Sequence, residues 1–306
     1  MNVFLLIVGL ILLIIGAELI IRGSVSLGKK LKVSLFAIGV VIVAGGTSLP
    51  ELASSINAVL IEHADLAVGA VIGSNIANLI LVMAATSFLF PIGNINQNQI
   101  NQGWINIFLS LILITMSYLL LSFNFLFGIL SICLLFFIMY IQVKQGSLDV
   151  SDVEGKGDYS LIISVIFIIL GIVLLIYGSN LFVDSAINIA SQLNIPEAII
   201  GVSLVAFGTS LPELVVGILS AIRRKVDFAL GNVLGSNIYN VLGVLGISSF
   251  FGNFRIPAII GSIDLLFMLF VSAMILGFMF FLKRIGRAYG TIGLILYFSY
   301  LFYIYN

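Results

Sequence analysis

The hexapeptide GTSLPE occupies residues 46–51 and recurs unchanged at residues 208–213. It belongs to a longer repeat, because residues 9–82 align without a gap on residues 171–244. Aligned positions are always 162 residues apart. Such self-similarity indicates that the chain consists of two related halves, each built from the same structural unit.

A second shared block, GSNIxN, lies further along each half. It begins at Gly73 in the first half and at Gly235 in the second. Both blocks place hydroxyl, amide or carboxylate groups inside long apolar stretches, where polar groups are costly to bury. The two blocks therefore contain the candidate functional residues.

The composition excludes most classes of soluble protein. Of 306 residues, 61% are apolar and 8% are charged, against about 25% charged residues in an average soluble domain. The mean hydropathy is +1.27, and 13 basic residues balance 13 acidic ones, which excludes a disordered chain and a basic nucleic-acid binder. A single cysteine and a single histidine exclude an internal disulfide and most metal or hydrolase chemistry. The sequence predicts a protein embedded in a bilayer.

Ten apolar stretches are long enough to cross the membrane as helices. A spanning helix needs about 20 mostly apolar residues. The predicted spans are residues 3–21, 33–60, 66–88, 104–122, 125–142, 160–182, 195–222, 226–250, 262–282 and 286–304.

Basic residues are distributed unevenly between the predicted loops. Twelve of the 13 Lys and Arg residues fall in alternate loops, and only Arg255 lies on the other side. Because cytoplasmic loops retain Lys and Arg, this bias predicts a plasma-membrane protein with both termini outside and a cytoplasmic central loop. Five spans per half is an odd number, so the two halves must insert in opposite orientations.

The predicted fold is therefore an all-α polytopic membrane protein with ten transmembrane helices in two inverted five-helix repeats. The first repeat covers residues 1–142, a cytoplasmic linker covers 143–159, and the second repeat covers 160–306. Inverted repeats are typical of secondary transporters, whose substrate site lies near the midplane where the repeats meet. A duplicated scaffold with no transport role is the alternative.

Each GTSLPE block is expected to break its membrane span. Pro50 and Pro212 have no backbone N–H, so the carbonyl groups of Gly46 and Gly208 lose their helical partner. Free carbonyl groups at membrane depth can bind cations. Hydroxyl and carboxylate groups share one face of each half-helix, and these are Thr47, Ser48 and Glu51, repeated by Thr209, Ser210 and Glu213.

The presence of two glutamates within predicted membrane spans needs a physical explanation, since inserting a carboxylate at the bilayer centre costs about 2.5–3.5 kcal/mol on insertion scales. A local reason is a capping box, because Ser48-x-x-Glu51 and Ser210-x-x-Glu213 both fit that motif. A functional reason is a site with a charge of −2, formed when the repeat axis brings both glutamates together. Such a charge suits one divalent cation, monovalent cations or protons.

The GSNIxN blocks give each helix a polar stripe. Hydroxyl and amide oxygens are hard ligands that suit sodium or calcium. Small and amide residues also join membrane helices to one another, so packing is an open alternative, chiefly for Asn75 and Asn237. The stripes are formed by Ser74, Asn75 and Asn78 and by Ser236, Asn237 and Asn240.

Other intramembrane polar residues are placed outside the site. Glu18 lies four residues before Arg22 and is expected to pair with it. Its aligned position is Asn180, so no symmetric ion site is implied there. Asp264 and Cys133 are expected to be interface and packing residues.

The repeated blocks resemble the two alpha repeats of the calcium/cation antiporter superfamily, specifically its prokaryotic sodium/calcium exchanger branch. The resemblance covers nearly the whole chain. The proton-coupled branch typically has Gly-Asn-Ala-x-Glu at the equivalent place, so GTSLPE favours sodium. The resemblance implies that the transported calcium and sodium ions bind at Glu51, Glu213, Thr47, Thr209, Ser48, Ser210, Asn78, Asn240, Ser74, Ser236, Ala44 and Ala206.

Within this set, the resemblance implies that Glu51 and Glu213 are ligands for both ions, and that their competition couples the two fluxes. Flanking sodium sites are implied within each half, formed by Ala44, Thr47, Ser48 and Ser74 and by Ala206, Thr209, Ser210 and Ser236. A gate formed by the first and sixth spans is implied to slide across a fixed core. Asn240 departs from the family pattern, since archaeal members carry Asp there, so potassium dependence and stoichiometry are open.

Other functions are weighed against sodium/calcium antiport. An intramembrane enzyme is not expected, because the chain has no serine elbow, no HExxH motif and no paired intramembrane aspartates. A passive channel and a calcium/proton antiporter stay open. No cofactor, nucleic acid or obligate protein partner is expected, and the surroundings are the lipid bilayer.

Overall fold

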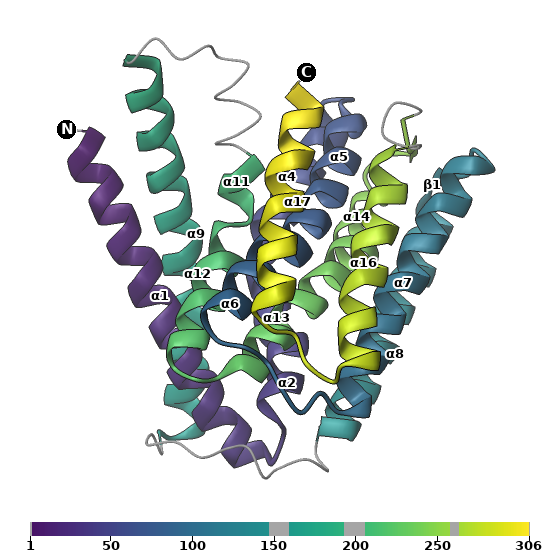
Figure 1. The fold of residues 1–306 in the computed structure, drawn as a ribbon. Helices are drawn as coiled ribbons and strands as arrows, with labels where there is room; N and C mark the ends of the chain where they lie inside the picture. Colours follow the sequence, from purple (N-terminus) through teal and green to yellow (C-terminus); the bar gives the residue numbers. More distant parts are fainter. Residues whose placement is uncertain (1, 147–158, 193–205, 258–262, 306) are drawn as a thin grey trace.

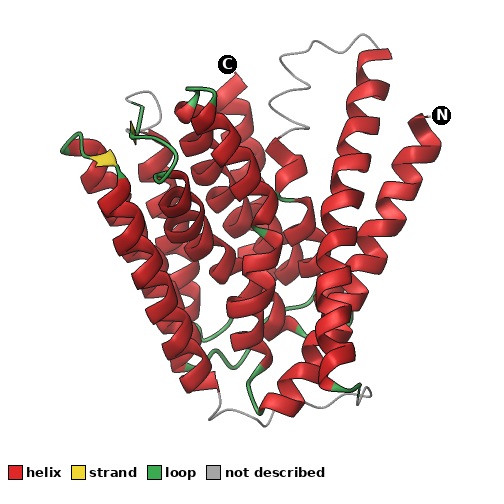
Figure 2. Ribbon diagram, turned by 180° about the vertical axis from the view of Figure 1, so that it is seen from behind, coloured by secondary structure: helices red, strands yellow, loops and turns green. Residues whose placement is uncertain are grey.

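The chain folds into a bundle of helices in the computed structural model, which describes residues 2–146, 159–192, 206–257 and 263–305. Figure 2 shows that helices account for nearly all of the described chain. Both termini lie at the same end of the bundle (Figure 1). The all-helical membrane fold predicted from the sequence is confirmed at this level.

The first half contains three interrupted or long helices followed by two regular ones. Its elements are α1 (Asn2–Leu31), α2 (Leu35–Ile38), the π-helix η1 (Gly39–Val43), α3 (Ala44–Thr47), α4 (Leu49–Leu60), α5 (Ala64–Ala77), the π-helix η2 (Asn78–Val82), α6 (Met83–Leu89), α7 (Gln97–Tyr118), β1 (Ser122–Phe123) and α8 (Phe125–Gly146).

The second half repeats this order. Its elements are α9 (Leu161–Gln192), α11 (Ala206–Thr209), α12 (Leu211–Ile222), α13 (Val226–Ile238), the π-helix η5 (Tyr239–Val244), α14 (Leu245–Ser248), β2 (Phe254–Arg255), α16 (Ile263–Phe281) and α17 (Arg287–Tyr305).

Three helices are longer than the predicted spans. Helix α1 continues beyond residue 21 to Leu31, and α9 continues beyond residue 182 to Gln192. Helix α7 begins at Gln97 rather than at residue 104, because Asn96 and Gln99 form a capping box. Hydropathy marks where lipid begins, whereas a helix ends where its backbone loses partners.

By length and composition, fewer than ten helices qualify as spans in the described part of the chain. Seven helices are long and apolar enough, or eight if the bent pair Leu35–Thr47 and Leu49–Leu60 counts as one span. Helix α12 is apolar but short. Residues 195–205 of the predicted seventh span and 147–158 of the predicted linker lie outside the described residues.

The predicted break in the second span is present at Ser48. The helices on either side meet at an angle of 41°, and Pro50 lies in the first turn of α4. Proline is favourable in this position because the N–H groups in the first turn of a helix have no hydrogen-bond acceptor within the helix. The break therefore places the start of α4, and with it Glu51, in the interior of the bundle.

Helices α1 and α9 pack directly against each other through glycines (Figure 1). A Cβ added to Gly16 would lie 2.8 Å from the carbonyl oxygen of Gly171, and one added to Gly9 would lie 2.9 Å from that of Gly178. Gly171 and Gly178 are the residues that align with Gly9 and Gly16. Replacing each residue by its aligned residue therefore turns the contact between Gly16 and Gly171 into the contact between Gly178 and Gly9. A two-fold axis between the halves requires this relation.

The paired extended segments show the same two-fold relation. Phe123 pairs with Phe254 in the two-stranded antiparallel ladder, and Ile92 pairs with Ile285 in an isolated bridge. Ile92 aligns with Phe254, and Phe123 aligns with Ile285. The described halves are thus related at their periphery as well as along the α1 and α9 contact.

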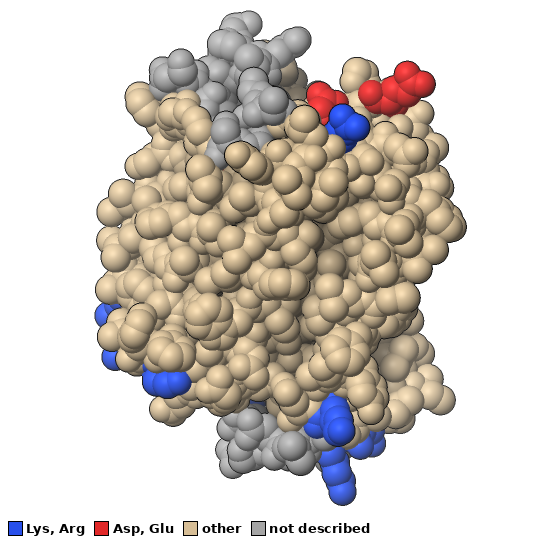
Figure 3. Space-filling view, turned by 90° about the vertical axis from the view of Figure 1, so that its right-hand side faces the viewer, with Lys and Arg blue, Asp and Glu red and all other residues tan. Residues whose placement is uncertain are grey.

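The centre of the bundle is formed by α5, η2 and α6 from the first half and by α13, η5 and α14 from the second. These segments contribute much of the main apolar core. Charged groups lie at the two ends of the face in Figure 3, where basic side chains gather at one end and acidic side chains, with a basic group beside them, at the opposite end. A band without charge between two charged ends fits a bilayer environment.

Candidate ion-binding site

Glu51 and Glu213 occupy equivalent positions in the first turns of α4 and α12. Each side chain is only 1% exposed. The capping-box explanation for them is wrong, because neither Ser48 nor Ser210 makes a side-chain cap hydrogen bond to its helix. The two carboxylates are therefore buried without the local purpose that the motif suggested.

Among the buried side-chain oxygens without a hydrogen-bond partner in the described part of the chain, six form three pairs related by the repeat. A buried polar atom without a partner costs about 1–3 kcal/mol, so six in equivalent positions require an explanation. Oxygen atoms that are left without protein partners are free to bind a cation. They are Glu51 Oε2 and Glu213 Oε2, Ser48 Oγ and Ser210 Oγ, and Asn78 Oδ1 and Asn240 Oδ1.

The asparagines of the two GSNIxN blocks hold one another in a reciprocal arrangement. Asn75 Nδ2 donates to the Asn237 carbonyl at 3.4 Å, and Asn237 Nδ2 donates to the Asn75 carbonyl at 3.2 Å. Asn78 Nδ2 donates to Asn237 Oδ1 at 3.0 Å, and Asn240 Nδ2 donates to Asn75 Oδ1 at 3.1 Å. These bonds assign packing to Asn75 and Asn237 and leave the oxygens of Asn78 and Asn240 available.

The Thr47 hydroxyl contacts the opposite half as well as Ala44 of its own half. Its hydroxyl lies 3.4 Å from Ser236 Oγ and 3.3 Å from Asn232 Oδ1. Ser236 in turn donates to Glu213 Oε1 at 3.5 Å. The two-fold axis thus brings the start of one broken helix against α13 of the other half, and the implied grouping of sodium ligands by half stays a prediction.

Asn232 was absent from the sequence-based set. It is fully buried on α13. The residue that aligns with it is Ala70, so a search for shared positions passes over it. Its spacing of four residues from Ser236 and eight from Asn240 places all three on one helix face, and this spacing is the signal that identifies it.

The other implied ligands are placed less completely. The Ala44 carbonyl accepts from the Thr47 hydroxyl at 3.4 Å and from the Ser48 amide at 3.1 Å. Ser74 is buried on α5. Thr209 ends α11, and Ala206 begins it, with a side chain outside the described part of the chain.

The carbonyl of Gly208 accepts a hydrogen bond that the sequence did not predict. Ser179 on α9 donates to it at 2.8 Å. Ser179 aligns with Ala17 on α1, so no equivalent hydroxyl faces the first broken span from that position. One of the two carbonyls expected to be free is thus held by the long helix that packs beside it.

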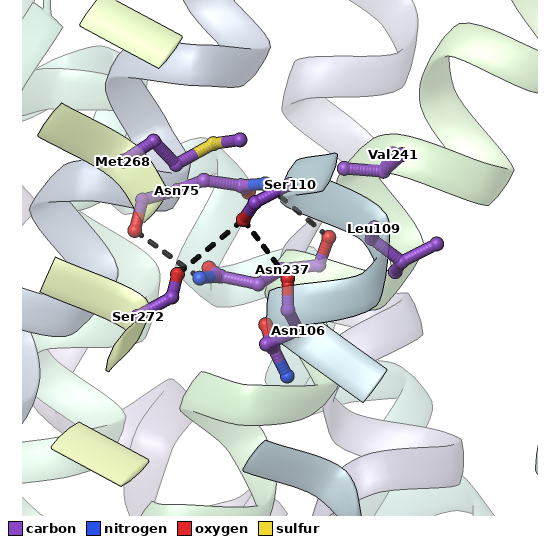
Figure 4. Close-up of a pocket in the computed structure, with 8 residues that line it drawn as sticks. All are labelled: Asn75, Asn106, Leu109, Ser110, Asn237, Val241, Met268 and Ser272. Atoms are coloured by element: carbon purple, nitrogen blue, oxygen red, sulfur yellow. Dashed lines mark hydrogen bonds between the residues drawn. The ribbon is translucent and has the colours of Figure 1, made fainter. Parts of the chain in front are cut away.

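A small polar pocket lies beside the asparagine arrangement, and Figure 4 shows Ser110 and Ser272 facing each other across it. Their hydroxyl oxygens are 3.5 Å apart, and the two serines are aligned residues of the repeat. Asn106 donates to the carbonyls of Gln102 and Leu234, which ties α7 to α13. Hydroxyls and amides thus continue from the ion site along the contact between the halves.

The charged residues outside the site behave largely as expected. Glu18 accepts from Arg22 Nε at 2.7 Å, which confirms the predicted pair. It also accepts from Arg223 at 3.0 and 3.1 Å, a contact that sequence spacing cannot predict. Asp264 accepts from the Tyr300 hydroxyl at 2.9 Å. Within the described ranges no group of three His, Cys, Asp or Glu side chains is placed to hold a metal ion.

The arrangement can therefore bind a hard cation. Two carboxylates supply negative charge, and hydroxyl, amide and carbonyl oxygens supply neutral ligands of the type that sodium and calcium prefer. Burial strengthens the attraction, since screening by water is weak at such a site.

The chain is similar to proteins that are named as sodium/calcium exchangers. The family model for sodium/calcium exchanger proteins matches residues 1–144 and 163–306. The sodium/calcium exchanger MaX1 of Methanosarcina acetivorans is 30% identical over 355 residues, with 99% of each chain covered. An uncharacterised membrane protein of Methanocaldococcus jannaschii is 35% identical over 294 residues, with 94% of this chain and 93% of the relative covered. A solved structure of the sodium-calcium exchanger NCX_Mj has a TM-score of 0.86 at 31% identity and covers 97% of both chains. The chain belongs to the sodium/calcium exchanger family.

Proposed function

We propose that this protein is a secondary active antiporter that exchanges sodium for calcium across the membrane. The observation that carries the proposal is the set of six unpartnered oxygens in three repeat-related pairs, which includes one oxygen of Glu51 and one of Glu213. Calcium and sodium compete for these two carboxylates. Because occupancy by one ion excludes the other, the inward flow of sodium drives calcium outward.

The topology that supports this function has ten transmembrane helices in two inverted repeats. The exchange of contacts between Gly9, Gly16 and their aligned residues supports a two-fold axis, and two halves in opposite orientation need an odd number of spans each. Both termini lie at the acidic end of the molecule (Figures 1 and 3). Since basic residues favour the cytoplasm, we place the termini outside and the central loop inside.

The arrangement of the helices supports alternating access. α1 and α9 are joined by close backbone contact at their glycines, and both present large apolar side chains to the surroundings. A tightly joined pair with an apolar exterior can move as one body against the core without exposing polar groups to lipid. We propose that this pair slides across the core and exposes the glutamates to each side in turn.

Reconstitution into liposomes tests the proposal. Uptake of labelled calcium should require an outward sodium gradient and should ignore a pH gradient. Uptake driven only by protons would assign the chain to calcium/proton antiport, and a requirement for potassium would assign it to potassium-dependent exchange. Uptake without any counter-gradient would identify a channel and overturn the proposal.

A further inference from the structure

Asn232 lies next to the ion site and has no role in the exchange as proposed above. Its side chain is completely buried on α13. Its Oδ1 accepts from the Thr47 hydroxyl at 3.3 Å, and its Nδ2 has no partner. A buried amide with an unused donor costs more than an apolar side chain of the same shape, so packing alone does not account for asparagine at this position.

The contact with Asn232 decides which way the Thr47 hydroxyl presents itself. A hydroxyl group has one proton and two lone pairs. When it binds a cation, a lone pair must face the ion and the proton must face an acceptor elsewhere. Asn232 Oδ1, at 3.3 Å, is such an acceptor. The hydroxyl also lies 3.4 Å from the Ala44 carbonyl, a second acceptor within its own half, and 3.4 Å from Ser236 Oγ, which leads on to Glu213.

We propose that Asn232 is a positioning residue of the ion site, which takes the hydroxyl proton of Thr47 and thereby turns its lone pairs toward a bound sodium ion. This inference rests on the proposed antiport. The sodium site at Thr47 is pre-organised by it, which reduces the ordering that binding requires.

The same device is missing from the other half. The position that aligns with Asn232 is Ala70, and a methyl group cannot accept a proton from a hydroxyl. Helix α5 therefore offers no amide acceptor at the position from which Asn232 on α13 contacts Thr47.

The test uses the full-length protein in liposomes, with labelled calcium uptake measured against sodium and against calcium concentration. The variant Asn232→Leu keeps the branching and the number of heavy atoms of the side chain and removes both the acceptor and the unpartnered donor. We expect the sodium concentration for half-maximal uptake to rise about three- to tenfold, as the loss of one buried hydrogen bond predicts. The half-saturating calcium concentration should change less than about twofold, because the glutamates are intact.

Thermal unfolding separates positioning from packing. Asn232→Leu should leave the melting temperature unchanged or raise it, since it removes an unsatisfied buried group. The matched control is Asn106→Leu, another buried asparagine that bonds only to backbone carbonyls. It should lower the melting temperature and leave the sodium dependence unchanged. If Asn232→Leu is too unstable to purify, Asn232→Ala is measured in the same way.

A double-variant cycle shows whether Asn232 acts through Thr47. In a Thr47→Val background there is no hydroxyl to orient, so Asn232→Leu should add no further change in sodium dependence. Full additivity, or an unchanged sodium constant in the single variant, would overturn the inference while wild-type exchange is intact. Absence of sodium-driven uptake in the wild type would instead overturn the proposed antiport.

Discussion

The two halves of this protein agree at the ion site and differ at its edges. Asn78 and Asn240 make equivalent bonds across the axis, and Glu51 and Glu213 are equally buried. In contrast, Asn232 aligns with Ala70. In the proposed antiport, ion binding uses what the halves share, whereas a preference for one direction must come from residues that only one half has.

The largest effect is expected at the shared glutamates. Glu51→Gln and Glu213→Gln each keep the shape of the side chain and halve the charge of the site, so each should reduce sodium-dependent calcium uptake at least about a hundredfold. Uptake by the reconstituted variants measures this. Glu62→Gln, at an exposed position, is the matched control and should transport normally.

Equal loss in both variants would support equivalence of the halves at the site. Retained calcium flux in both single variants would contradict the assigned roles. A large loss in only one of them would mean that calcium depends on one carboxylate, and the comparison would then fail at its centre.

Repetition explains what the sequence could predict. A residue that occurs at the same place in both halves, such as Glu51, can be identified from the sequence because the repeat points to it. The break at Pro50 follows from proline chemistry alone. Asn232 and Arg223 have no such partner, so their contacts depend on the fold. The packing role of Asn75 was open for a similar reason, because its bonds cross to the other half.

Helix lengths were the least predictable part of the fold. Hydropathy placed the start of α7 at residue 104, but the capping box formed by Asn96 and Gln99 starts it at Gln97. Apolar runs report burial in lipid, and polar caps report where the backbone finds its first partners. A sequence scan that weighs only the first signal shortens every helix that extends beyond the membrane.

The glycine contacts between α1 and α9 give the next largest effect. A Cβ at Gly16 would meet backbone atoms at 2.8 and 3.0 Å, and one at Gly178 would meet them at 2.9 Å. Gly16→Ala and Gly178→Ala should each destabilise the protein by about 1–3 kcal/mol, as overpacking does, which thermal unfolding in detergent measures. Gly277→Ala should do the opposite, because nothing lies within 4 Å of its added Cβ and alanine favours the helix.

Unequal losses at Gly16 and Gly178 would show that the two-fold relation of this helix pair does not extend to its energetics. A stable Gly16→Ala variant would mean that α1 can move away from α9, which would remove the support for their movement as one body.

Asn240→Asp also tests the centre of the site, with a smaller expected effect. It raises the charge of the buried ligand set from −2 to −3, so we expect the half-saturating calcium concentration to fall about tenfold and the sodium dependence to steepen. Asn78→Asp is the symmetric control and should act alike if the halves are equivalent there. An unchanged sodium dependence in Asn240→Asp would mean that position 240 does not set the stoichiometry.

The smallest expected effect concerns an ion pair that only one half possesses. Glu18 on α1 bonds to Arg223 at the end of α12 at 3.0 and 3.1 Å, and the aligned residues, Asn180 and Ile61, cannot form such a pair. The contact ties α1 to the core at one end of the bundle.

Glu18→Gln removes this tie, so it should change the ratio of forward to reverse exchange rates. Because both side chains are partly exposed, the change in the ratio should be about two- to fivefold. The change should be smaller when choline chloride screens the charges. Arg22→Gln is the control, since it removes the bond to Glu18 within α1 and keeps the contact between Glu18 and Arg223, and it should leave the ratio unchanged. Equal changes in both directions would mean that the pair does not distinguish the two states, and the preference for direction would then have to come from another residue that one half lacks.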